Sequence, residues 1–215
     1  MRVTSLLLPL CRLSVAMLLT LVVNLNAAAS TLLQMSFGEL VGGAELIFEG
    51  RVVAVEPRQQ PGEMIKTWVT FAVTDVVKGN FARDEIELSF LGGRLGGRQL
   101  EVTDMAIPEI GETGFYFVET LLEAQVNPLL GWDQGRYLIE TQPDGDTVVT
   151  TADHDPVLAL EVEAPAAANG QPMNILETGR ADGVVVQSFG TASFLSQPMS
   201  VEDFKTSILS VLARP

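Results

Sequence analysis

The sequence predicts a mainly β protein, an antiparallel barrel or sandwich with one short helix near its start and another at its end. Segments in which apolar and polar residues alternate recur about every 10 to 20 residues along the chain. Only two segments carry helical capping and spacing, and no helical pattern joins consecutive strands as a parallel sheet requires. These observations favour an all-β architecture of paired antiparallel strands.

The first expected element is a short helix over residues 36–41. Ser36 can accept a hydrogen bond at its start, and Glu39 stands three residues later, which is the spacing of a capping box. The glycine pair Gly42–Gly43 follows and is expected to end the helix.

Three strands are predicted next, over residues 46–56, 65–77 and 84–90. Apolar residues at every second position place one face of each strand in the core. In the second strand the alternation fails near Asp75, which predicts a β-bulge there. On the first strand the residues expected on the buried face are Leu46, Phe48, Val52 and Ala54.

A glycine-rich connection, residues 92–98, is expected to join two strand segments as a hairpin or bulge. The same double glycines suit a phosphate cradle, but no Lys-Ser/Thr pair follows and no helix opens after them. Later strands are expected over residues 115–119, 136–140, 147–151 and 184–186, the second and third forming a hairpin across a Pro-Asp-Gly-Asp turn.

The chain is predicted to end in a helix over residues 200–213. Ser200 is its expected N-cap, and acidic residues in the first turn favour the helix dipole. Its apolar stripe comprises Val201, Phe204, Ile208, Val211 and Leu212.

Residues 1–29 are predicted to be a cleaved signal peptide. Arg2 and Arg12 supply positive charge, residues 13–25 are almost wholly apolar, and three alanines before Ser30 suit a signal peptidase. The alternative is an uncleaved membrane anchor, but the apolar run is shorter than the roughly 20 residues that span a bilayer. The protein is therefore expected to be exported, either periplasmic or secreted.

The mature chain is expected to hold one domain. Residues 30–160 form the predicted β-barrel domain, residues 161–199 a loop-rich extension packed on it, and residues 200–213 the terminal helix. The extension is predicted because the composition turns to Ala, Pro, Asn and Gly after residue 161.

Charge and cysteine content exclude several classes of function. With 27 acidic against 13 basic residues the formal charge is −14, which disfavours nucleic-acid binding and, after signal cleavage, docking on anionic membranes. The single cysteine, Cys11, lies in the leader, so the mature chain has no thiol for catalysis, for a disulfide or for a metal site. No cofactor is expected.

Several motifs taken together resemble a family of exported bacterial proteins without assigned function. The chain carries Gly-Gly-x-x-Gly-Gly at residues 92–97, Pro-x-x-Gly-Glu at residues 108–112 and Gly-Trp-x-Gln-Gly at residues 131–135. They follow a Phe-Glu-Gly-Arg-Val strand and a Thr-rich strand ending in Val-Val-Lys-Gly. The resemblance covers residues 32–141.

The strand order is also distantly similar to the OB-fold of netrin modules and tissue inhibitors of metalloproteinases. This similarity implies an OB-like barrel. Those inhibitors act through a disulfide-linked N-terminal cysteine, which the mature chain lacks. Their mode of inhibition is therefore not implied for this chain.

The most suggestive candidate site is the cluster Trp132, Gln134 and Tyr137. Glycines on both sides could expose an aromatic ring and an amide together, which suits sugar or peptide binding. The structural alternative is that Trp132 plugs one end of the barrel and Gln134 bonds a neighbouring backbone. Arg94 and Arg98 are the second candidates, because two arginines flanking a turn in an acidic protein suit an acidic partner group.

Other polar groups are interpreted as surface features. His154 stands between two aspartates, but one histidine leaves a zinc site short of ligands, and the Asp-Gly-Asp turn at residues 144–146 lacks the rest of a calcium loop. No hydrolase motif occurs. The expected function is a non-enzymatic binding or accessory module for an unknown protein, peptide or glycan. The alternatives are a carboxylate-based hydrolase and a protease-regulating inhibitor.

Overall fold

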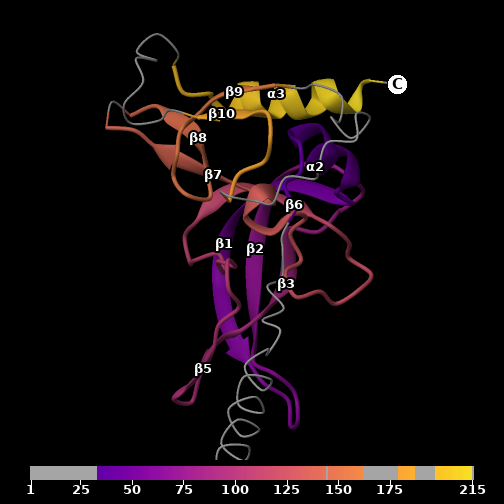
Figure 1. Cartoon of the computed structure of the whole chain (residues 1–215), viewed down its shortest axis with the longest axis vertical. Coiled ribbons are helices and arrows are strands. Elements are labelled where there is room, and N and C mark those ends of the chain that lie inside the picture. The colour runs from indigo at the N-terminus through magenta and orange to yellow at the C-terminus, as the bar shows by residue number, and fades with distance from the viewer. Residues whose placement is uncertain (1–32, 144, 162–178, 187–196, 215) are drawn as a thin grey trace, which may run out of the picture. The chain divides into compact units, whose positions relative to one another are not determined.

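The computed structural model describes residues 33–143, 145–161, 179–186 and 197–214 (Figure 1). The predicted signal peptide and most of the predicted extension lie outside the described residues. Contacts divide the chain into two units, Met1–Thr31 and Leu32–Pro215, and all described residues belong to the second unit. No helix among these residues is long and apolar enough to cross a membrane.

Six antiparallel strands form the main sheet, in the order β3-β2-β1-β6-β7-β8. Their bounds are Leu46–Arg58 for β1, Lys66–Lys78 for β2, Glu85–Leu91 for β3, Thr113–Val118 for β6, Arg136–Thr141 for β7 and Thr147–Thr151 for β8. The mainly β class and the antiparallel pairing are confirmed. Among the described strands, no pairing between the edge strands β3 and β8 closes this sheet into a barrel.

Two further pairs of strands lie outside the main sheet. The glycine-rich connection forms a hairpin of β4 (Gly93–Leu95) and β5 (Arg98–Leu100), as predicted. The second pair is β9 (Val157–Leu160) with β10 (Val184–Val186). The sequence predicted β10 but missed β9.

The bulges in β1 and β2 explain one wrong expectation about burial. The predicted bulge near Asp75 is confirmed, because the register between β1 and β2 shifts there. A second shift leaves Val53 without a partner between Val52 and Ala54. It reverses the alternation, so Val55, and not Ala54, packs against the buried cluster.

The two central strands, β1 and β6, are buried on both faces. One face contributes Ile47, Phe115 and Phe117 to a cluster that also holds residues of both helices. The other face contributes Leu46, Phe48 and Tyr116 to a cluster with β2 and β3. One sheet thus separates two apolar cores, and each consists of side chains fully removed from water.

The two predicted helices are present. Helix α2 (Phe37–Gly43) has the expected capping box, with Glu39 N–H donating to Ser36 Oγ at 3.2 Å and Ser36 N–H to Glu39 Oε2 at 2.8 Å. Both glycines lie inside the helix, which ends at Gly43, two residues later than expected.

Helix α3 (Val201–Leu212) is capped by Ser200 and buries Phe204 and Ile208. Leu212, expected in the apolar stripe, is exposed. Lys205 lies 2.9 Å from both Glu49 on β1 and Asp75 on β2 and so attaches the helix to the main sheet. Figure 1 shows α3 at the end of the described unit opposite the β4–β5 hairpin.

Candidate functional site

Two adjoining grooves lie at the base of the β4–β5 hairpin. The larger, which we call the acidic groove, has a volume of about 830 Å³. The smaller, the apolar groove, has a volume of about 560 Å³. Gly93, Arg94, Ile107 and Glu109 line both of them, so the two grooves meet at these residues.

Arg94 is the basic side chain in the lining of both grooves. Its Nε and Nη2 donate to Gln99 Oε1 at 3.1 and 2.8 Å, which fixes the guanidinium across the hairpin. Among the described residues no carboxylate forms an ion pair with Arg94. Gln99 therefore holds the guanidinium in place, and its positive charge is not neutralised by an ion pair with any described carboxylate.

The glycines of the hairpin let its backbone approach the main sheet closely. Gly93 has φ of +124°, and a Cβ at this position would overlap Thr67 Oγ1. Thr67 is buried on β2 and donates to the Gly92 carbonyl at 2.7 Å. A side chain at residue 93 would push the hairpin away from β2 and deform both grooves.

The opposite wall of the grooves is the loop over residues 105–112. It supplies Ile107, Pro108 and Ile110 to the apolar groove, facing Val55 and Pro57 from β1. Ile110 is 70% exposed, so a ligand that covered it would remove apolar surface from water.

A buried ion cluster holds this loop from beneath. Arg136 binds the Glu112 carboxylate through two hydrogen bonds of 3.0 and 2.8 Å, and Tyr116 donates to the same carboxylate at 2.9 Å. Only 7% of the Arg136 side chain and 11% of the Glu112 side chain are exposed. Glu112 also accepts the Glu109 N–H at 3.3 Å, so its charge orders the groove wall. Burial, together with the Glu112 charge, raises the pKa of Tyr116.

Asp133 completes the cluster on the other side of Arg136. Its Oδ1 lies 3.6 Å from Arg136 Nη1, and its carboxylate accepts a hydrogen bond from the Ala106 backbone N–H. Burial raises the pKa of Asp133, and the nearby Arg136 partly opposes the rise. Two carboxylates sharing one guanidinium thus fix both ends of the segment from Ala106 to Glu112.

The structure separates the predicted Trp132, Gln134 and Tyr137 cluster. Trp132 is half-buried with φ of +59°, in a 3-10 turn η1 (Trp132–Gly135). Gln134 is buried and bonds backbone only: it accepts from Met35 N–H and donates to the Leu33 and Gly131 carbonyls. These hydrogen bonds agree with the structural alternative given above, in which Gln134 bonds a neighbouring backbone.

Tyr137 lies in the core and not on a surface shared with Trp132. It is 2% exposed and packs against the rings of Phe37, Phe117 and Phe204. Burial raises the pKa of its hydroxyl. A stacking platform built from Trp132 and Tyr137 together therefore does not form.

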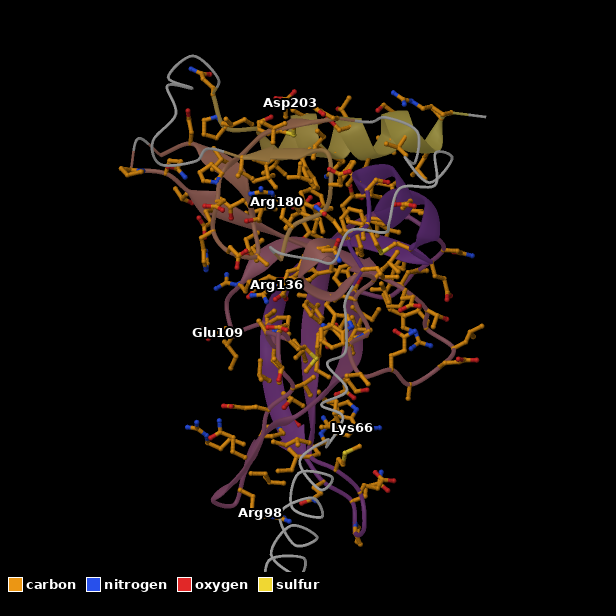
Figure 2. All side chains as sticks on the ribbon, viewed as in Figure 1. Lys66, Arg98, Glu109, Arg136, Arg180 and Asp203 are labelled. Atoms are coloured by element: carbon orange, nitrogen blue, oxygen red, sulfur yellow. The ribbon has the colours of Figure 1, made fainter. Side chains whose placement is uncertain are left out.

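The two arginine candidates also separate. Arg98 is exposed, donates to Gln59, and lines neither groove. Figure 2 places it near the tip of the hairpin, with Glu109 between it and Arg136 in this view. Only Arg94 of this pair belongs to the grooves.

His154 is exposed in the turn after β8, with φ of +66°, and pairs with the Glu140 carboxylate. The described part of the chain has no group of three or more His, Cys, Asp or Glu side chains arranged to hold a metal ion.

Comparison with family models, with curated proteins and with solved structures finds no match for this chain. Its function is therefore argued from the geometry of the grooves alone.

Proposed function

We propose that the protein is an exported, non-enzymatic binding module that holds a segment of a partner protein in the two grooves at the β4–β5 hairpin. The observation that carries this proposal is Arg94, fixed where the grooves meet and without an ion pair among the described residues. In a chain of net charge −14, a basic group that forms no ion pair with a described carboxylate suits an acidic group on a ligand.

The composition of the grooves favours a peptide over a glycan. Val55, Pro57, Ile107 and Ile110 give the apolar groove aliphatic walls, which suit aliphatic side chains. Sugar rings favour aromatic platforms, and none of the described residues that line the two grooves is aromatic. The partner is therefore proposed to present apolar and acidic side chains together.

The hydrolase alternative is supported by the three carboxylates Glu101, Asp104 and Glu109 in the lining of the acidic groove, but not by the buried ion cluster. The buried carboxylates Glu112 and Asp133 are both engaged by Arg136, and neither lines a groove. A carboxylate that neutralises a buried guanidinium is a poor general base, because proton uptake would break the ion pair. The inhibitor alternative needs a protruding loop without a cleft, whereas this hairpin has grooves at its base.

Export is part of the proposal, supported by the leader-like sequence of residues 1–29. We expect the exported protein to begin within two residues of Ser30. N-terminal sequencing of protein recovered outside the cytoplasm checks this, and retention of Met1 in that material would show the leader to be uncleaved.

The OB-like barrel and the resemblance to the exported family are also proposed. Three register shifts between β1 and β2 support the barrel, because bulges increase the bend and twist that barrel strands need. NMR contacts joining the two edges of the sheet, directly or through one further strand, are expected. A sheet with two solvent-exposed edges would contradict the barrel.

The binding site is tested by selecting random displayed octapeptides on the immobilised exported protein. Wild type and Arg98→Gln are expected to enrich the same peptides, because Arg98 lies outside the grooves. Arg94→Gln and Ile110→Asp are each expected to weaken those peptides by about tenfold or more, since each removes one type of groove contact. Both replaced side chains are exposed, so unchanged melting temperatures are expected. Equal binding by all four proteins would refute the site.

A further inference from the structure

We infer that the bound segment is an internal, extended stretch of the partner whose side chains run in the order apolar, acidic, basic. This inference rests on the proposed function, because it assigns the chemistry of the ligand to the same two grooves. It is carried by the different composition of the grooves on the two sides of Arg94.

The position of Arg94 favours an acidic side chain over a chain terminus. The grooves share Gly93, Arg94, Ile107 and Glu109 and continue on both sides of them. A ligand that ended in a carboxylate at Arg94 would fill one groove and leave the other empty. A ligand that fills both must pass Arg94, so the carboxylate that meets the guanidinium belongs to a side chain within the segment.

The lining of the apolar groove indicates which side chains lie on one side of that acidic residue. Its walls are Val55, Pro57, Ile107, Pro108 and Ile110, and its charged members are the two shared residues Arg94 and Glu109. Covering Ile110, which is 70% exposed, removes apolar surface from water and favours aliphatic side chains at this end.

The lining of the acidic groove indicates which side chains lie at the other end of the bound segment. Three carboxylates line it, those of Glu101, Asp104 and Glu109, alongside Arg94. None of the three forms an ion pair with a Lys or Arg of the described residues. A Lys or Arg of the ligand placed here would meet uncompensated negative charge, whereas an acidic residue would be repelled.

The three zones lie in a fixed order because Arg94 and Glu109 are common to both grooves. An extended chain rises about 3.3 Å per residue, so the side chains that reach neighbouring zones belong to residues close in the ligand's sequence. A second copy of this protein is a poor occupant, because two chains of the same strong negative charge repel each other.

The test is fluorescence anisotropy with labelled peptides and the full exported protein. The reference is the heptapeptide Leu-Val-Leu-Asp-Gly-Lys-Lys, blocked at both ends. Two further blocked heptapeptides carry one change each, Asn in place of Asp or Glu-Glu in place of Lys-Lys. The fourth peptide is Leu-Val-Leu, blocked only at its amino end, so that a free terminal carboxylate replaces the Asp side chain. The same series is measured on Arg94→Gln, Ile110→Asp and, as the matched control, Arg98→Gln.

The reference peptide is expected to bind wild type and Arg98→Gln equally, and about tenfold or more tighter than any of the three altered peptides. On Arg94→Gln the Asp and Asn peptides are expected to bind alike. If the terminal-carboxylate peptide binds as tightly as the reference, or if Asn and Glu-Glu change nothing, this inference is overturned. Sensitivity to Ile110→Asp would then still support the proposed site, whereas loss of that sensitivity as well overturns both.

If no peptide changes the anisotropy and the protein self-associates as its concentration rises, the grooves bind a second copy. That result would overturn the inference. Melting temperatures of all variants are measured alongside, so a change of binding is not mistaken for unfolding.

Discussion

Replacement of Arg136 by methionine is expected to lower the free energy of unfolding by about 3–5 kcal/mol. The guanidinium is the shared partner of the Glu112 and Asp133 carboxylates, and the Glu112 side chain is only 11% exposed. Without Arg136, two negative charges stay partly removed from water with no cation beside them. Urea unfolding followed by circular dichroism measures the loss.

The matched control is Arg58→Met. Arg58 also binds a carboxylate through two hydrogen bonds, to Glu87 at 3.2 and 2.9 Å, but 44% of its side chain is exposed. Its loss is expected to cost far less stability than the loss of Arg136, because water screens this exposed pair. Adding Glu112→Met to Arg136→Met is expected to restore part of the stability, because it removes one unpaired charge. Equal losses for Arg136→Met and Arg58→Met would show that burial does not strengthen the cluster.

Replacement of Phe204 by alanine is expected to cost about 3–5 kcal/mol. Phe204 is fully buried, and its ring centroid lies 4.8 Å from that of Tyr137, 5.0 Å from that of Phe115 and 5.7 Å from that of Phe37. Its removal leaves a cavity where α3 meets α2 and the main sheet. Thermal and urea unfolding measure the effect.

Leu209→Ala, on the same helix, is the control for Phe204→Ala. Leu209 is 49% exposed, so its truncation is expected to change stability by no more than about 0.5 kcal/mol. A similar small loss for Phe204→Ala would mean that α3 is not held by its aromatic contacts.

The sequence predicted the elements whose signals are local. Strand β3 alternates cleanly because only one of its faces is buried. The capping box of Ser36 and Glu39 predicts the start of α2 from two residues that are three positions apart. Strand β9 was missed because its partner, β10, comes more than twenty residues later and its four residues show no alternation. The bulge at Val53 was missed because any residue of that apolar run can be the unpaired one.

The candidate site was predicted only through Arg94. A basic residue beside glycines in an acidic chain is visible in the sequence, but the grooves need walls from β1, from the hairpin and from residues 105–112. The pairing of Glu112 with Arg136 joins residues 24 positions apart and has no periodic pattern. The hydrogen bonds of Gln134 to backbone agree with the structural interpretation of its motif, whereas neither interpretation of that motif predicts the burial of Tyr137.

The burial of β1 and β6 on both faces has a consequence for how the protein opens. Because Ile47 and Phe115 belong to one core while Leu46 and Tyr116 belong to the other, neither core can come apart without breaking the strands that serve both. Amide hydrogens in the shared part of β1 and β6 should therefore exchange with deuterium only through complete unfolding, with one common free energy of opening. Among the described strands the β4–β5 hairpin pairs only with itself, so its amides should exchange far faster, and the grooves can open and close while the rest of the molecule keeps its protection.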